Sequence, residues 1–446
     1  LPDRFLQGTE AGQAATLLEV EWWRRFRDPI LDGLVDKALG YNTDVVAAMA
    51  RIDEADAVYK EAFGGSLPQV DGSGRAQRGR IQFPLAPDGF LVTNSVTASV
   101  AANYEIDFWG RMRRTREAAR AGAVGSRHGA DVTRMSVAAG VAQAYITLRG
   151  LDEQIRLAER TLASRDEQMK LIRIQFDGGT ASSLDYQQAR GLRADAVVQL
   201  RELQRQRGVM QTQIALLTGE PGAVLPVDGS DDPLSRLPVP PVAPPGLPST
   251  LLERRPDVLA AENRMRAAGF RMHEARAAML PRLTLTGTAG SSGTALNQID
   301  DSAGMVSNII AGITMPIFQG GALLAESRAS AADRRAAASE YVRTAISAWS
   351  EVEGAISADQ SLEVREREFA IAAEEAQEAQ ELAEREYSRG VATLFELIDA
   401  YTRRIDAERG LITARAARVS NRIAYHVALG GGARTGGIDA SRGAAP

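Results

Sequence analysis

The sequence carries one pattern twice, and this repeat restricts the fold more than any other feature. The segment FDGGTASSLD at 176–185 returns as YSRGVATLFE at 387–396, where Gly390 takes the place of Gly179, 211 residues earlier. At a similar offset, DVVAAMAR (44–51) pairs with DVLAAENR (257–264). A repeat that keeps its order over most of the chain predicts a fold built from two equivalent halves.

Very long helices are predicted in both halves. Proline is absent from 88–220 and from 317–445, so one helix can run from Arg111 to about Phe176 and a second from about Ala322 to Tyr387. Apolar residues recur every seven positions along the first of these helices, and this heptad seam is interrupted by Arg165.

Proline also separates the halves, because the segment 219–248 holds nine of the eighteen prolines and is predicted to be an extended connector. The predicted organisation is N-terminal helices (1–66), a first strand hairpin (67–108), a long helix with its turn and return helix (109–218), the connector (219–250), the initial helix of the second repeat (251–279), a second strand hairpin (280–318), a second long helix with its turn and return helix (319–430), and a tail (431–446).

The strands are recognised by strict alternation. LVTNSVTASVAANYEID at 91–107 places Val96 and Val100 on an apolar face and small hydroxyl residues on the other face. In the second half, an apolar set repeats at every second position, namely Ile309, Ala311, Ile313, Met315 and Ile317. The partner strands are predicted at 281–290 and, as a weaker copy, at 69–77. Tyr104 and Trp109 would suit an aromatic belt at a membrane interface.

These strands favour a membrane over water, although soluble hairpins that pack their apolar faces together are an alternative. We expect Val96, Val100, Ile309 and Ile313 to face lipid. Four strands cannot close a barrel, and an open sheet edge in lipid leaves backbone groups without hydrogen-bond partners. The chain is therefore expected to oligomerise, and three copies would supply twelve strands.

Composition and motifs point away from other classes of function. With 52 basic and 57 acidic residues, the net charge of −5 argues against nucleic-acid binding. Cysteine is absent, and the three histidines, His128, His273 and His426, lack the spacing of metal ligands. No nucleophile is paired with a base, so we expect neither an enzyme nor a bound metal or cofactor.

The chain resembles the TolC/OprM-type outer-membrane efflux factors, in particular the NodT/OprM branch of RND-type tripartite systems. The resemblance is carried by YEIDFWGRMRRTREAA (104–119), LLERRPDVLAAENRMRAA (251–268), RGVATLFELIDAYTRR (389–404) and ALGGG (428–432). It implies an α+β membrane protein of a Gram-negative bacterium: a homotrimer with a twelve-stranded outer-membrane β-barrel, four strands from each chain, continuous with a long periplasmic α-helical barrel.

The resemblance also implies partners and site residues. A periplasmic adaptor would contact the helical turns, called tips here, and an inner-membrane pump of the RND type would lie beyond it. The tip residues are Gly179, Thr180, Ala181 and Ser182 in the first half, and Gly390, Val391, Ala392 and Thr393 in the second. Phe395, Glu396 and Asp399 would line a periplasmic aperture, while Asp185 and Tyr387 would latch neighbouring helices. Ala392 replaces a basic latch residue of some relatives.

The expected function is a passive exit duct for drugs or other small molecules, with energy supplied elsewhere. A duct for type I protein secretion and a soluble coiled-coil scaffold are alternatives. Relatives of this branch usually begin with an acylated cysteine, which this sequence lacks. Either the chain was cut or mutated there, so that a lipid anchor is not visible in it, or this member is not a lipoprotein.

Overall fold

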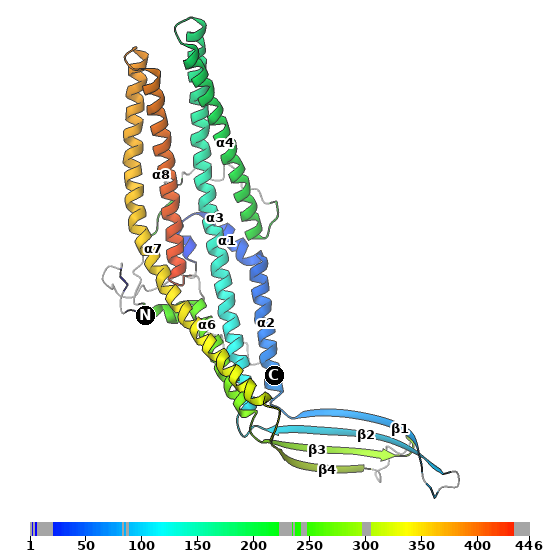
Figure 1. Ribbon diagram of the computed structural model, residues 1–446. Helices are drawn as coiled ribbons and strands as arrows, with labels where there is room; N and C mark the ends of the chain where they lie inside the picture. Colours follow the sequence, from blue (N-terminus) through cyan, green and yellow to red (C-terminus); the bar gives the residue numbers. More distant parts are fainter. Residues whose placement is uncertain are drawn as a thin grey trace. The chain divides into compact units, whose positions relative to one another are not determined.

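The computed structural model describes residues 2, 5–6, 21–82, 84–85, 89–222, 234, 237–241, 248–296 and 305–431. The order of the elements follows the predicted repeat (Figure 1). In the first half, these elements are the 3₁₀ helix η1 (Trp22–Phe26), α1 (Pro29–Tyr41), α2 (Thr43–Gly64), β1 (Gln69–Gln82), β2 (Phe90–Ile106), α3 (Arg111–Asp177) and α4 (Ser183–Thr218). In the second half, they are α5 (Thr250–Arg254), α6 (Pro256–Ala277), β3 (Arg282–Gly293), β4 (Met305–Thr314), α7 (Ala322–Ser388) and α8 (Leu394–Ala428).

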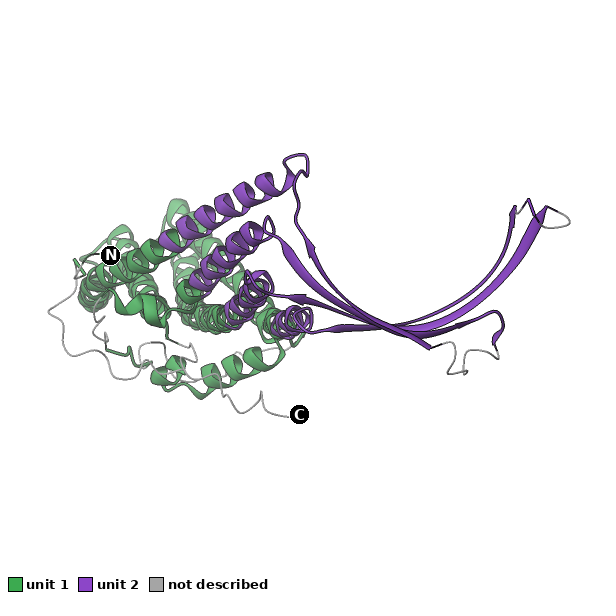
Figure 2. Cartoon of the chain, turned by 90° about the horizontal axis from the view of Figure 1, so that it is seen from below, with its two compact units in different colours: residues 1–50, 128–259, 343–446 green, residues 51–127, 260–342 purple. Residues whose placement is uncertain are grey.

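The elements form two compact units, coloured separately in Figure 2. Unit 1 consists of residues 1–50, 128–259 and 343–446, and unit 2 of residues 51–127 and 260–342. The helices α2, α3, α6 and α7 contribute residues to both. Of the predicted connector, residues 223–233, 235–236 and 242–247 lie outside the described residues, as do residues 432–446 of the predicted tail.

Unit 2 contains one antiparallel sheet in the order β1-β2-β3-β4. The first strand is longer than the sequence predicts, because pairing with β2 extends it from Gln77 to Gln82. The last strand ends earlier than the sequence predicts. β4 ends at Thr314, so Met315 and Ile317 do not belong to it. Pro316 has no N–H group to donate to a ladder, which explains why pairing stops there.

Cross-strand pairing settles which residues share a face of the sheet. Val100 lies opposite Ala289, and Ala289 lies opposite Ser307, two residues before Ile309. Directly paired residues point to the same side, and residues two apart along a strand do so as well. Val96, Val100, Ile309 and Ile313 therefore share one face, which we call the apolar face. The opposite face carries mainly hydroxyl and amide side chains, among them Thr97, Ser99, Thr286 and Asn103.

The core of unit 1 is assembled around η1 and α1. Trp22 and Phe26 are fully buried there, together with Tyr145 of α3 and Ile423 of α8. Asp28 begins α1 by accepting hydrogen bonds from the backbone N–H groups of Ile30 and Leu31.

The second carboxylate oxygen of Asp28 accepts a 2.7 Å bond from the Tyr145 hydroxyl and forms a 3.1 Å ion pair with Arg149. A buried charge is costly unless it is paired, so this contact fixes α1 against α3.

The predicted long helices are confirmed, since α3 and α7 contain 67 residues each. Among the described residues, no helix is long and apolar enough to cross a membrane.

Candidate functional site at the helical tips

The two tips are built in the same way, which accounts for the repeated sequence. At the end of α3, Gly179 has a φ of 74°, and at the end of α7 Gly390 has a φ of 75°. This left-handed conformation is open to glycine without strain. The backbone N–H groups of Thr180 and Ala181 then donate to the Gln175 carbonyl, and those of Val391 and Ala392 donate to the Glu386 carbonyl in the same manner.

The return helices also begin alike, each with a reciprocal cap. In α4, the Ser182 hydroxyl accepts from the Asp185 N–H, while the Asp185 carboxylate accepts from the Ser182 N–H at 3.0 Å. In α8, Thr393 and Glu396 make the same pair of bonds, with the Glu396 carboxylate 2.7 Å from the Thr393 nitrogen. Ser-x-x-Asp and Thr-x-x-Glu are sequence signatures of this cap.

The three predicted aperture residues therefore have different environments within one chain. Phe395 is 77% exposed. The Glu396 carboxylate accepts hydrogen bonds from the Thr393 backbone N–H and hydroxyl in the α8 cap. These hydrogen bonds lower the pKa of its carboxyl group. Asp399 forms a 2.7 Å ion pair with Arg403 one turn further along α8. Two carboxylates are thus present at this end of α8, each with a partner of its own.

The two predicted latch residues do not contact one another within the chain. The Asp185 carboxylate is bound to Ser182, and no hydrogen bond of the Tyr387 hydroxyl is seen among the described residues. Tyr387 instead lines a cavity of about 670 Å³ bordered by α3, α7, α8 and residues of both tips. A latch to a neighbouring chain stays a prediction for both residues.

One polar contact between the α3–α4 hairpin and the α7–α8 hairpin centres on Tyr401 of α8. Its hydroxyl donates a 2.5 Å bond to Glu384 of α7, and its ring lies 5.3 Å from the guanidinium carbon of Arg165 of α3. Burial and the Glu384 hydrogen bond raise the pKa of Tyr401, and burial lowers the pKa of Arg165. Gln168 accepts a 2.9 Å bond from Arg165.

Sequence reasoning did not identify this cluster as part of the site, although one signal was present. Arg165 is the charged residue that interrupts the heptad seam, and it is only 5% exposed. Burying a charge at a seam position is costly unless a specific partner compensates for the lost hydration, so a buried charge there indicates such a partner. That the partner is an aromatic ring from α8 could not be read from the spacing, because it depends on how two distant hairpins pack.

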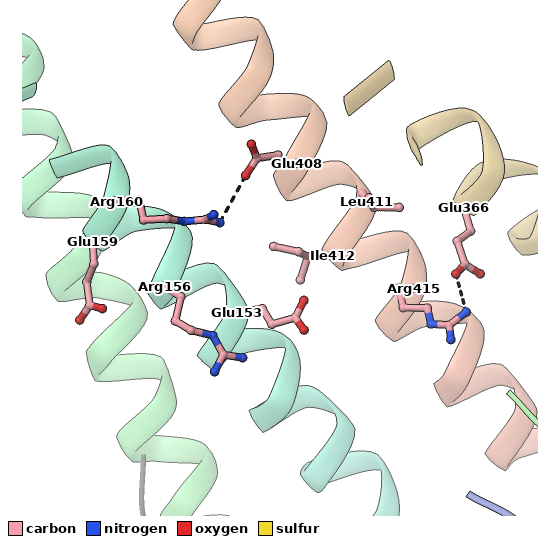
Figure 3. Close-up of a pocket in the computed structure, with 9 residues that line it drawn as sticks. All are labelled: Glu153, Arg156, Glu159, Arg160, Glu366, Glu408, Leu411, Ile412 and Arg415. Carbon is pink, nitrogen blue, oxygen red and sulfur yellow. Dashed lines mark hydrogen bonds and ion pairs between the residues drawn. The ribbon is translucent and has the colours of Figure 1, made fainter. Parts of the chain in front are cut away.

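A second cavity of about 620 Å³ lies between α3, α7 and α8 (Figure 3). Its walls are charged: Arg160 pairs with Glu408 at 3.5 Å, and Arg415 pairs with Glu366 at 2.5 Å. Glu153 accepts a hydrogen bond from the backbone of Leu234. Most of these charges are already paired across helices, so the cavity walls serve to hold α3, α7 and α8 together.

The described residues contain no cluster of three or more side chains able to hold a metal ion. The features that stand out among the described residues are geometric: two similarly built tips at the ends of long helices, and a sheet with one apolar and one polar face.

Comparison with known proteins identifies the family. The profile described as "Outer membrane efflux protein" matches residues 34–220 and 247–431, one segment in each half. The chain is 31% identical over 437 residues to the pyoverdine export outer membrane protein OpmQ of Pseudomonas putida, covering 97% of this chain and 92% of OpmQ. It is also 31% identical to the outer membrane protein OprJ of Pseudomonas aeruginosa, covering 94% and 88% of the two chains.

Solved structures agree with the fold. The outer-membrane channel OprN is 27% identical and superposes with a TM-score of 0.89, covering 96% of both chains. The open state of the MtrE outer membrane channel of Neisseria gonorrhoeae is 27% identical, with a TM-score of 0.86 over 97% of this chain and 96% of MtrE. The predicted α+β fold of trimeric outer-membrane channels is thereby confirmed. This chain belongs to the outer membrane efflux protein family.

Proposed function

We propose that this chain is one third of a passive exit duct through the outer membrane, which conducts small molecules from the periplasm as the last component of a tripartite efflux system. Three copies would close a barrel of twelve strands, with β1 of one copy pairing with β4 of the next. Its helices would form the periplasmic tunnel, and its tips would meet a periplasmic adaptor. Relatives described as components of antibiotic and toluene efflux pumps support this choice of cargo and pump.

The observation that carries the proposal is the division of the sheet into two unlike faces. Ile309 and Ile313 on the apolar face are 80% and 74% exposed, so no described part of the chain covers them. Lipid is the environment in which such a face is stable, whereas the hydroxyl and amide face suits a lumen filled with water. In a soluble scaffold, this exposed apolar face would be in contact with water, which is unfavourable.

The tips are the proposed contact with the adaptor and the proposed gate. Gly179, Thr180, Ala181 and Ser182 form one tip, and Gly390, Val391, Ala392 and Thr393 the other. Because the two tips share their backbone geometry, a trimer would present six similar turns. Val391 is 74% exposed and offers an apolar contact to such a partner.

Recordings in planar bilayers test this function. The wild-type protein should insert and conduct weakly, because the tips close the aperture. Exchanging the proposed latch residues, Tyr387→Phe with Asp185→Asn, should raise the conductance several-fold. The asparagine amide oxygen can still accept from the Ser182 N–H and support the α4 cap, while the contacts between chains weaken.

Tyr341→Phe, which removes a hydroxyl from α7 far from the tip in sequence, is the matched control and should leave conductance unchanged. If neither the wild-type protein nor the latch variant conducts, the chain is not a duct.

A further inference from the structure

The apolar face of the sheet contains two charged residues, and both lie toward the same end. Arg78 and Arg80 of β1 are directly opposite Asn94 and Val92 of β2, which places them on the face of Val96 and Val100. Every other described strand position on this face of β1 to β4 is uncharged. Both arginines are exposed, and the strands offer them no acidic partner on this side.

Their depth can be estimated from the register. Asn94 and Val92 lie 12 and 14 residues from Ile106, where β2 ends and the chain continues toward α3. At about 3.3 Å per residue and a tilt of about 40°, this separation corresponds to roughly 30 to 35 Å along the membrane normal. The apolar band of an outer-membrane barrel is about 25 Å tall. With Ile106 at the periplasmic interface, the two arginines lie just beyond the outer edge of the apolar band.

Phe90 strengthens this assignment. The guanidinium carbon of Arg80 lies 4.0 Å from the centre of the Phe90 ring, which holds the cation against an apolar surface. An aromatic residue beside cations is typical of the boundary between acyl chains and headgroups. The group that such a site would meet from the lipid side is an anion attached to an acyl chain.

We propose that Arg78 and Arg80 form a binding site for the phosphate groups of lipid A in the outer leaflet of the outer membrane. This inference rests on the proposed function, because it requires the apolar face to be in lipid. Lipid A carries phosphates on its sugar headgroup at the depth of the two arginines, and arginine is suited to bidentate contacts with phosphate. The neighbouring apolar face would receive its acyl chains.

Arg75 provides a matched control. It lies on the same strand but opposite Thr97, so it points to the polar face of the sheet and away from lipid. Lipid binding to the purified trimer can be counted by native mass spectrometry, with bisphosphorylated lipid A, dephosphorylated lipid A and phosphatidylglycerol as the three probes.

The wild-type trimer should prefer bisphosphorylated lipid A to both other probes. The double variant Arg78→Gln and Arg80→Gln should bind it about 30-fold more weakly, since each arginine near an anionic surface contributes about a factor of five. Arg75→Gln should bind it as the wild type does. Equal binding by the double variant, or by dephosphorylated lipid A or phosphatidylglycerol, would overturn the site.

Conductance recorded on the same trimers separates the two claims. If the double variant forms conducting trimers that still bind lipid A, only this inference is overturned and the proposed function stands. A protein that forms no conducting trimer overturns the proposed function and this inference together.

Discussion

Arginine in place of Val100 should prevent the chain from assembling in the outer membrane. Val100 lies near the middle of β2, on the apolar face, and is 52% exposed within the chain. An arginine facing lipid at mid-bilayer costs roughly 2 to 4 kcal/mol per chain, and a trimer would bear this cost three times. Ile309→Arg should have the same effect. The measurement is the fraction of heat-resistant trimer recovered from outer membranes.

Each of these variants has a control one residue away on the other face. Ser99→Arg and Asn308→Arg place the same charge toward the polar face, where water solvates it, and both should assemble nearly as the wild type does. The same contrast is expected for Val96 against Thr97 and for Ile313 against Gly312. If arginine is tolerated equally on both faces, the assignment of the lipid side is wrong.

Neutralising the two acids at the start of α8 should reduce the preference of the duct for cations by about tenfold. If three copies of Glu396 and Asp399 converge at the periplasmic end, six carboxylates concentrate cations at one narrow opening. Within one chain, the hydrogen bonds from Thr393 lower the pKa of Glu396 and so favour its charged form.

The local structure decides which substitutions are informative. Alanine at position 396 would also remove the carboxylate half of the reciprocal cap of α8, whereas Glu396→Gln can retain it. Asp399→Asn removes the second charge and frees Arg403. Asp406→Asn, which breaks a similar pair with Arg409 two turns further along α8, serves as the control. Permeability ratios from reversal potentials measure the effect, and an unchanged ratio in the double variant would mean that these acids do not line the aperture.

Elements that depend on local pattern were predictable. The alternation in β2 and the heptad seam of α3 each repeat over many residues, so the element and its apolar face follow from the sequence alone. The shared turn of the two tips follows from the repeated glycine, because Gly179 and Gly390 permit the same left-handed conformation.

Features that depend on contacts between distant segments were not predictable. Three glycines, at positions 72, 74 and 79, interrupt the alternation of β1, so the side occupied by Arg78 and Arg80 becomes known only from the pairing with β2. The contact of Arg165 with Tyr401 likewise requires the packing of two hairpins. The caps of Asp185 and Glu396 are a different case, because their sequence signatures were present but the acids were interpreted only as latch and aperture residues.

The central claim, that the chain is one third of an outer-membrane duct, is tested most directly by the mass of the native particle. We expect the protein to be extracted from outer membranes only with detergent, and its protein mass to be three times the 47.8 kDa of one chain. Light scattering with correction for bound detergent gives this mass. A monomer that purifies from the soluble fraction without detergent would contradict the account.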